Sequence, residues 1–506
     1  MTIEKLQSYR ARYQALKQAR GPWMNTWKEL STYLAPTRGF FDGDTPNSGR
    51  RIDHKTLLDS SASLAVGVLG AGMMSGLTSP SRSWFDLTLQ PTAFKKLPGA
   101  SAWLLEVKKA LESALAKSNV YSVLQQMYEE LAVFGTAAFL VEEDSKGGIY
   151  CRPFTVGEYV LDVDEKGRVN TFGRECRMTA KQLAAAFGVG ALPPALAQAA
   201  TSDTNSSTYT VIHLIMPNPH YDPDQLDNAH FAYESAYLLE DGTLLRRGGY
   251  HEFPVVCARW ETKNTADSYG RGPGWKVLGD VKMLQKMQKA KLVALDKNTN
   301  PPVMVSASVQ GEVNLLPGGI TRCNSLTDAA VKPAYQVQAD LTSLESALES
   351  VRQTIRSHFF ADVFVMLSAQ DIPNMTATEV AERRQEKMLL LGPVLQRLKT
   401  ELLDPLIERT YYILLRQGAI PPAPEALYGL EMHVTYISTI AQAQRASAVE
   451  PLVQGIEYAT RISQADPSVQ GRVDYTRALE EGLENLGVDQ VLLRPEVEES
   501  DEAYTA

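Results

Sequence analysis

The chain of 506 residues is long enough for roughly three ordinary domains or for one large architecture. Its 44% apolar and 22% charged residues are ordinary for a globular protein. The net charge of -9 argues against a protein that grips nucleic acid with its whole surface. This charge leaves open a protein that lets nucleic acid pass without holding it.

The N-terminal region is expected to be helical. Residues 5–20 have an amphipathic pattern, and Gly21-Pro22 is predicted to break this helix. A second helix is expected to reach Pro36, with four apolar side chains on one face: Trp23, Trp27, Leu30 and Leu34. Residues 37–56 are expected to form a loop. The charged start lacks the apolar core that a signal peptide needs.

The stretch LAVGVLGAGMMSGLTSP, at residues 64–80, is the most apolar and glycine-rich one in the chain. A membrane helix needs about 20 apolar residues, but only 14 residues run from Leu64 to Leu77 and Ser75 interrupts them. A dinucleotide-binding loop needs the spacing G-x-G-x-x-G, whereas the glycines here give G-x-G-x-x-x-G. The stretch therefore favours neither a membrane span nor a nucleotide site.

The favoured interpretation of this stretch is a closely packed helix. Ser60 or Ser61 would cap its start and Pro80 would follow its end. Four small residues would let a neighbouring element approach: Ala65, Gly67, Gly70 and Ala71. The following SPSRSWFDLTL predicts a turn into a short strand.

The middle of the chain changes from helix to strand. Residues 101–118 and 120–140 have helical patterns, and the signal is of the β type from there to about residue 260. EYVLDVDEKGRVNTFGREC, from residue 158, has two alternating runs around an Asp-Glu-Lys-Gly turn and predicts a hairpin. A polar loop is expected from residue 192.

A strong helical signal covers residues 275–299. Its apolar stripe consists of Val277, Val281, Leu284 and Met287, and its neighbouring row of lysines of Lys282, Lys286 and Lys289. Six lysines and two aspartates between residues 276 and 300 give a local charge of +4. The lysine row has two interpretations here: a solvated outer face, or a surface that faces a channel or a neighbouring subunit.

Two more helices follow a turn-bounded strand region at residues 301–323. One covers 342–360, where Thr342 and Glu345 predict a capping box before an apolar stripe of Leu344, Leu348, Val351, Ile355 and Phe359. The other starts at Thr376 and reaches about Gln417, roughly 60 Å at 1.5 Å per residue. Pro393 and Pro405 are predicted to bend it. The chain is expected to be helical again from about residue 437 and to end in an acidic tail.

No motif for catalysis or cofactor binding is convincing. There is no P-loop, nucleophile elbow, or Cys/His arrangement of a known type. Asp162 and Asp164 hint at a calcium loop, but Lys166 and Gly173 stand where oxygen ligands are needed. A surface excursion between strands, rather than a metal site, is expected for His213, His220 and His230. The four cysteines are far apart in sequence, so we expect neither a disulfide framework nor a zinc knuckle. Since no other ligand or cofactor motif is convincing, we also expect no other metal and no cofactor.

Four segments, spread in order through residues 1–420, carry a resemblance. They are the opening helix with Trp23 and Trp27 up to Pro36, LLDSSASLAVGVLGAGMMSGLTSPSRSWFDL, DSYGRGPGWKVLGDVKMLQKMQK and TATEVAERRQEKMLLLGPVLQRLKTELLDPLIER. The last segment, followed by an alternating strand, is the most specific. In this combination and order the segments resemble the portal (head-to-tail connector) proteins of short-tailed, T7-like bacteriophages.

The resemblance implies an α+β fold and a dodecameric ring around a channel, with a mixed α/β wing, a helical stem and a small α/β clip. The implied parts are a wing at 1–270, stem helices at 271–300 and 340–360, a clip at 301–339, a tunnel loop at 361–375, a long kinked helix returning to the wing at 376–436, and a short helical crown with an acidic tail at 437–506.

The resemblance also suggests residues and partners. The channel would be lined by Lys282, Lys286, Lys289, Met366, Leu367, Gln370 and Asp371, and the clip would dock partners through Val313, Leu315 and Leu316. The partners would be copies of the same chain, double-stranded DNA without sequence specificity, the terminase large subunit, the scaffold, the major capsid protein and a tail adaptor, without a membrane. The protein would be assembled in the host cytoplasm and stay in the virion at the portal vertex.

Two alternatives stay open on the sequence alone. One is a helical scaffold or adaptor protein of a virion without a DNA channel. The other, less favoured, is an enzyme that processes nucleic acid.

Overall fold

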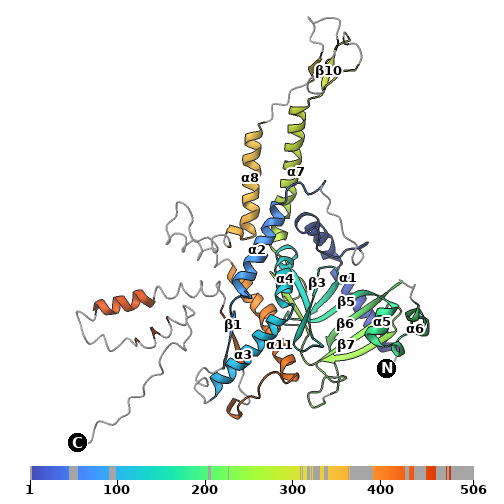
Figure 1. Ribbon diagram of the computed structural model, residues 1–506, viewed down its shortest axis with the longest axis vertical. Helices are drawn as coiled ribbons and strands as arrows, with labels where there is room; N and C mark the ends of the chain where they lie inside the picture. The colour runs from blue at the N-terminus through green and yellow to red at the C-terminus, as the bar shows by residue number, and fades with distance from the viewer. Residues whose placement is uncertain are drawn as a thin grey trace.

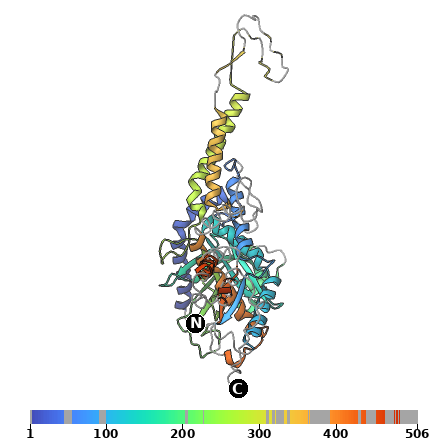
Figure 2. The ribbon, with the colours of Figure 1, turned by 90° about the vertical axis from the view of Figure 1, so that its left-hand side faces the viewer.

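The structure is a computed structural model. It describes residues 3–44, 55–89, 99–202, 207–225, 227–307, 309, 312–315, 320, 322, 331–334, 340–362, 364, 391–427, 432–437, 452–462, 475, 478–479 and 482. Figures 1 and 2 show a body of helices and sheets from which two long helices project as an antiparallel pair. These are α7 (Pro273–Thr299) and α8 (Leu341–His358).

The N-terminal helix α1 is one helix, Ile3–Leu34, so the predicted break at Gly21-Pro22 was wrong. Pro22 lies inside it and would cost about 3 kcal/mol in a helix interior. The side chains on both sides of the proline are buried in two different hydrophobic clusters: Tyr9, Tyr13 and Leu16 in a smaller one, Trp27, Leu30 and Leu34 in the main one. Burying each such side chain is worth about 1.5–3 kcal/mol, so packing outweighs the proline.

The apolar stretch forms the predicted helix, α2 (Ser61–Leu77), which packs on α4 (Val120–Phe134). A Cβ at Gly70 would lie 2.8 Å from Cγ of Glu129, and one at Gly72 would overlap the ring of Phe364. Two of the four small residues, Ala65 and Gly70, are buried as predicted.

Three details of the α2 prediction were wrong. Ala71 is exposed, and Gly67 faces open space among the described residues. Ser60 is the N-cap residue without a side-chain bond. The cap bond comes from Asp59, whose Oδ1 accepts from Ser61 N at 2.9 Å.

The predicted helix at 120–140 is too long, because α4 ends at Phe134 and strand β2 (Thr136–Glu143) follows at once. The residue between them, Gly135, has φ of 82°, which favours glycine. A Cβ there would also overlap the backbone of Gly272. The preceding helix α3 (Ala100–Lys117) matches its prediction.

The two larger sheets of the body are antiparallel. The first has the order β3-β2-β9, with β3 at Ile149–Phe154 and β9 at Val255–Arg259. The second has the order β4-β5-β6-β7-β8, with the bounds Tyr159–Val163, Val169–Thr179, Thr208–Pro217, Tyr233–Leu239 and Leu244–Tyr250. The predicted hairpin is confirmed as β4 and β5.

His213 was expected in a surface excursion, but it is buried in β6. Its Nε2 lies 3.0 Å from Oγ of Ser235, while its Nδ1 is buried without a hydrogen-bond partner among the described residues.

The polar loop expected from residue 192 is partly helical. Helices α5 (Ala180–Phe187) and α6 (Pro194–Thr201) flank a 3-10 turn at Val189–Ala191. Leu192 and Leu196 pack into a small hydrophobic cluster on the second sheet. Pro194 stands in the first turn, where proline favours a helix.

The long C-terminal helix is interrupted, as predicted. Residues 391–398 are helical, Lys399–Leu403 form a π-helical turn, and α11 (Asp404–Arg416) follows with Pro405 in its first turn. A π-turn next to a proline is a usual cause of a bend. The predicted start at Thr376 and the acidic tail lie outside the described residues.

Short elements complete the described body. Strand β1 (Phe85–Leu89), which the sequence predicted, pairs antiparallel with β12 (Met432–Tyr436). A 3-10 turn covers Glu425–Leu427, and residues 452–462 are helical.

Candidate functional site

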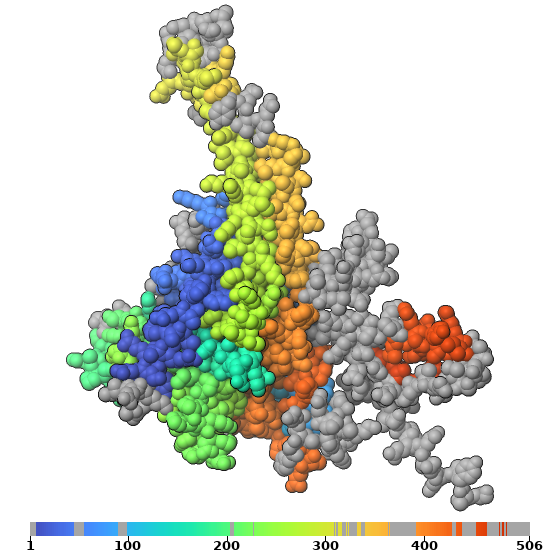
Figure 3. Space-filling model, turned by 180° about the vertical axis from the view of Figure 1, so that it is seen from behind, coloured from blue at the N-terminus to red at the C-terminus, as the bar shows by residue number. Residues whose placement is uncertain are grey.

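The projecting pair of helices, here called the stem, lies side by side in Figure 3. Both predicted apolar stripes are buried. On α7, Val277, Val281 and Leu284 are fully buried, and Met287 is partly buried. On α8, Leu348, Ile355 and Phe359 are fully buried, and Leu344 and Val351 are partly buried. Helix α8 contacts both α7 and α2, so the stem is joined to the body by packing.

The cap of α8 differs from the predicted capping box. Asp340 is the N-cap residue, and its side chain accepts hydrogen bonds from the backbone N–H groups of Thr342 and Ser343. Glu345 instead forms ion pairs with Lys291 of α7 and, at 3.3 Å, with Arg352. Asp caps more effectively than Thr, and the carboxylate of Glu345 is thereby free to cross-link the two stem helices.

The structure separates the three lysines that the sequence placed in one row. Nζ of Lys282 lies 2.9 Å from Oε2 of Glu29 and 5.7 Å from the ring centre of Tyr33, so it binds α1 of its own chain. Lys286 and Lys289 are exposed and form no ion pair among the described residues. These two lysines therefore remain available for another molecule.

A buried polar junction joins the stem to the start of α2, and the sequence analysis missed it. Oε1 of Gln285 accepts from the backbone N–H groups of Leu58 and Asp59 at 2.7 and 2.8 Å, and its Nε2 donates to the Asp59 carbonyl at 2.7 Å. Arg352 donates to Oδ2 of Asp59 from Nε at 3.0 Å and from Nη2 at 2.9 Å. The junction thus ties α7 and α8 to the same short segment.

The charges of the junction support each other. Burial alone would raise the pKa of Asp59, but hydrogen bonds from Ser61 and the Arg352 guanidinium outweigh it and lower that pKa. The hydrogen bond to Asp59 in turn raises the pKa of Arg352. The pair is therefore charged at neutral pH. No local pattern could reveal it, because its members are more than 200 residues apart in the chain.

The tip of the stem carries the predicted strand region. Strand β10 (Val303–Val305) lies within that region and pairs antiparallel with β11 (Val331–Pro333), which lies beyond it (Figure 1). Leu315 is 59% exposed and Val313 is half-buried. Leu316 and the four predicted tunnel residues, Met366, Leu367, Gln370 and Asp371, lie outside the described residues.

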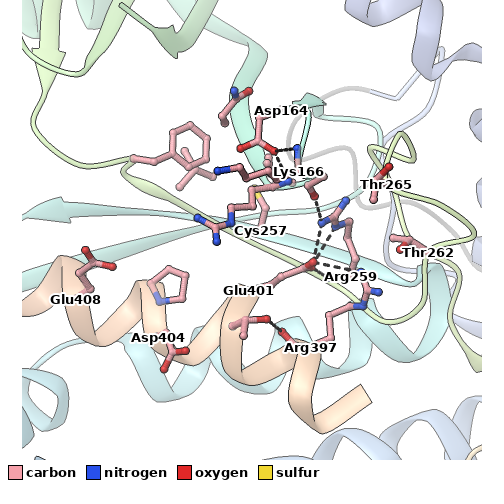
Figure 4. A pocket seen from close by; sticks show the side chains of 18 of the residues that line it. Asp164, Lys166, Cys257, Arg259, Thr262, Thr265, Arg397, Glu401, Asp404 and Glu408 are labelled. Carbon is pink, nitrogen blue, oxygen red and sulfur yellow. Dashed lines mark hydrogen bonds and ion pairs between the residues drawn. The ribbon is translucent and has the colours of Figure 1, made fainter. Parts of the chain in front are cut away.

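A charged groove of about 1210 Å³ lies between the body sheets and the bent helix (Figure 4). Its main cross-link is Arg259 of β9, whose guanidinium is 2.6 Å from Oε1 of Glu401 in the π-turn. Arg259 also donates to the carbonyls of Asp267 and Gly167 at 2.8 and 2.7 Å. Its side chain is only 3% exposed, so this buried pair fixes the π-turn against the sheet.

The other carboxylates of the groove have structural partners or neighbours. Oδ1 of Asp404 accepts from the Tyr436 hydroxyl at 2.6 Å, and Glu252 pairs with Arg409 and Arg416. Burial, together with the charges of Glu252 and Asp404, raises the pKa of Glu408. This arrangement joins the helix to the sheet and shows no nucleophile held by a base.

Neither a metal centre nor a membrane span emerges from the described part of the chain. No group of three or more His, Cys, Asp or Glu side chains there is arranged to hold a metal ion. Asp164, from the weighed calcium loop, uses its Oδ1 to accept from the backbone of Lys166 and Arg168 in its own turn. No described helix combines the length and the apolarity that crossing a bilayer requires.

Comparisons with known proteins agree on one family. A family model described as bacteriophage head to tail connecting protein matches residues 6–493. The chain is 36% identical over 490 residues to a protein named probable portal protein from Bordetella phage BPP-1, covering 96% of this chain and 88% of that one. It is 35% identical over 489 residues to the portal protein of Salmonella phage epsilon15, covering 95% and 87%.

A more distant relative fits the T7-like resemblance. The portal protein of Escherichia phage T7 is 24% identical over 444 residues, covering 82% of this chain and 75% of that one. The family and its named members are structural components of the virion, not enzymes. The chain belongs to the head-to-tail connecting family of bacteriophages and is a phage portal protein.

Proposed function

We propose that the chain acts as a closed dodecameric ring at one vertex of the capsid, with DNA entering and leaving through its centre. The stem carries this proposal: the outer parts of α7 and α8 project beyond the body, and their outward faces are lined by exposed residues (Figures 1 and 3). A head-to-tail interface that closes on itself covers such faces in every copy. The portal identity of the relatives supports the same arrangement.

The division of the chain into parts is proposed on the same ground. Residues 1–270 form the wing, 271–300 and 340–360 the stem, and 301–339 the clip. The segment 361–375 forms the tunnel loop, 376–436 the bent helix and its return, and 437–506 the crown and tail. The tunnel loop brings Met366, Leu367, Gln370 and Asp371 to the DNA.

The chemistry of the channel follows from the charge of the chain. Each phosphate that a protein neutralises adds affinity, so a wall that must let DNA slide cannot be strongly basic. A net charge of -9 suits such a wall, and no base-reading element is proposed. The stem lysines serve either the channel or the contact between subunits.

The docking partners are proposed from the position of the clip. The exposed Leu315, at the far end of the stem, and Val313 and Leu316 near it would bind first the terminase large subunit and later a tail adaptor. The wing and crown would contact the scaffold and the major capsid protein. We propose that the ring assembles in the host cytoplasm and is then part of the virion, at the portal vertex of the capsid.

Native mass spectrometry of the purified full chain tests the proposal. The expected species is twelve times the chain mass of 55.7 kDa, and electron micrographs should show an axial hole wide enough for duplex DNA. A scaffold or adaptor without a channel would give a solid particle, a filament or a monomer, and any of these would contradict the proposal.

A further inference from the structure

One face of α7 is largely exposed in the described part of the chain. It consists of Lys286, Lys289, Ala290, Val293, Ala294 and Lys297, which line a shallow concavity of about 400 Å³. We call it the basic face. Lys289 and Val293 each stand two residues from Lys291, about 200° around the helix. Since Lys291 binds Glu345 of α8, these two side chains lie on the side of α7 away from α8. Val293 is 45% exposed and adds an apolar side chain to this face.

The outward face of α8 is polar and carries no lysine. It consists of Ser346, Glu349, Ser350 and Gln353, all exposed, and we call it the serine face. Ser346 precedes the fully buried Ile355 by nine residues, so this face also points away from the stem contact. Helix α8 contains no lysine, whereas α7 contains six. The two outer faces of the stem are therefore different, as a head-to-tail interface requires.

Contacts inside the stem fix which residues lie at the same height. Lys291 binds Glu345, and Gln285 and Arg352 both bind Asp59. Because the two helices are antiparallel, each residue forward along α8 corresponds to one residue back along α7. Counting in this way from the two levels places Glu349 level with residues 287–288, between Lys286 and Lys289. The same count places Ala290 level with Ser346.

We propose that the basic face of one copy binds the serine face of the next copy, so that Lys286 and Lys289 bracket Glu349 of the neighbouring copy. This inference rests on the proposed ring and names one of its interfaces. The side chain of Glu349 is 53% exposed although Arg352 and Arg356 contact it, so it keeps an open side for the two lysines. The short serine side chains let Ala290 and Val293 approach closely. These lysines then serve the subunit contact and do not line the channel.

A cysteine pair tests the placement. The double variant Ala290→Cys/Ser346→Cys cannot form a disulfide within one copy, because the two positions lie on opposite outer faces of the stem. Mild oxidation of its rings should give a ladder of covalent oligomers, with at least tenfold more cross-linked chain than either single variant. The matched control Ala290→Cys/Ser357→Cys moves one cysteine by eleven residues, about 16 Å along the helix, and should stay at the level of the single variants.

Reversing the charges on the two faces is a second test of the proposed interface. Lys286→Glu/Lys289→Glu should lower the fraction of chain in rings at least fivefold, and adding Glu349→Lys should restore most of it. Lys276→Glu, at the base of α7 beside Glu261, is the control and should leave rings intact. Rings that give no ladder, or lysine variants that assemble normally, would overturn the interface and leave the ring standing. A parent protein without rings would overturn the proposed function itself.

Discussion

At the scale of single residues, two buried acids have opposite effects. Asp59 is stabilised as a carboxylate by Arg352 and the backbone of Ser61, so its charge supports the folded state. Glu130, on α4, is only 1% exposed, and Oε2 has no hydrogen-bond partner among the described residues. Its charge opposes folding.

We predict that Asp59→Ala loosens the base of the stem. The substitution leaves Arg352 without its inward partner and removes the cap bond to Ser61, a loss of about 2–3 kcal/mol. Thermal unfolding of the purified variant should show a lower midpoint than the parent. Asp42→Ala, which changes an exposed acid in the loop after α1, is the control and should stay within about 0.5 kcal/mol of the parent. An unchanged midpoint for Asp59→Ala would refute the role of the junction.

We predict that Glu130 makes the protein less stable as the pH rises from about 4.5 to 7. Burial raises the pKa of Glu130 from 4.5 to about 7, although Arg38 and a 2.8 Å hydrogen bond from Thr155 act against this. Between these values the folded state binds more protons than the unfolded state, so stability falls with rising pH. This difference in the pKa of Glu130 between the unfolded and folded states corresponds to a loss of about 3 kcal/mol in the free energy of unfolding.

Urea unfolding of Glu130→Gln at several pH values checks this prediction. At pH 8 the neutral amide should be more stable than the parent by up to about 3 kcal/mol, and the difference should vanish near pH 4. Glu106→Gln, which changes an exposed acid on α3, should follow the parent throughout. A Glu130→Gln variant that is less stable than the parent at pH 8 would show that Arg38 keeps the carboxylate charged.

At the scale of elements, packing between helices and sheets determines where a helix or strand departs from the structure that its local sequence favours. The stem helices follow their apolar stripes, and the β4–β5 hairpin follows its alternation, because one face of each is buried. Pro22 stays in a helix because both flanks are buried in different clusters. Gly135 ends α4 because the backbone of Gly272 leaves no room for a side chain.

These elements show what the sequence could and could not predict. Periodicity recovers faces that are buried along one helix or strand, such as Val277, Val281 and Leu284. It cannot recover the Asp59–Arg352 and Arg259–Glu401 pairs, because tertiary contacts bring each pair together across 293 and 142 residues. The lysine row was found, but the pairing of Lys282 with α1 required the fold.

We predict opposite effects for two glycines of α2. Gly67→Ala should stabilise the protein by up to about 1 kcal/mol, because a helix interior prefers alanine and Gly67 faces open space among the described residues. Gly72→Ala should destabilise it by about 1–3 kcal/mol, because the added methyl group overlaps the ring of Phe364. Chemical denaturation of both variants checks the pair. Equal effects would mean that α2 is not closely packed at Gly72.

We also predict that the bent helix depends on one buried ion pair. Glu401→Gln leaves Arg259 buried without a countercharge and should cost about 3–5 kcal/mol. Arg397→Ala removes a more exposed contact to the same carboxylate, 33% exposed on the arginine side, and should cost less than about 1 kcal/mol. Calorimetric unfolding compares the two. Similar losses of stability in the two variants would show that the Arg259–Glu401 pair does not hold the π-turn in place.

At the scale of the whole molecule, the two outer faces of the stem differ in charge, as the interface of the proposed closed ring requires. One stem face is basic and the other is not, and neither is covered by a described element of its own chain. In the proposed ring, an acidic net charge would keep the wall from binding the passing DNA tightly. Because part of the interface is ionic, raising the salt concentration should weaken ring closure more than it weakens folding of the subunit.

Cryo-electron microscopy of the purified full chain tests the central claim most directly. The account predicts a closed ring in which the α7–α8 pairs stand side by side around an open axial channel, with each α7 against the α8 of the next copy. A solitary folded subunit at micromolar concentration, or a ring whose stems do not touch one another, would contradict it.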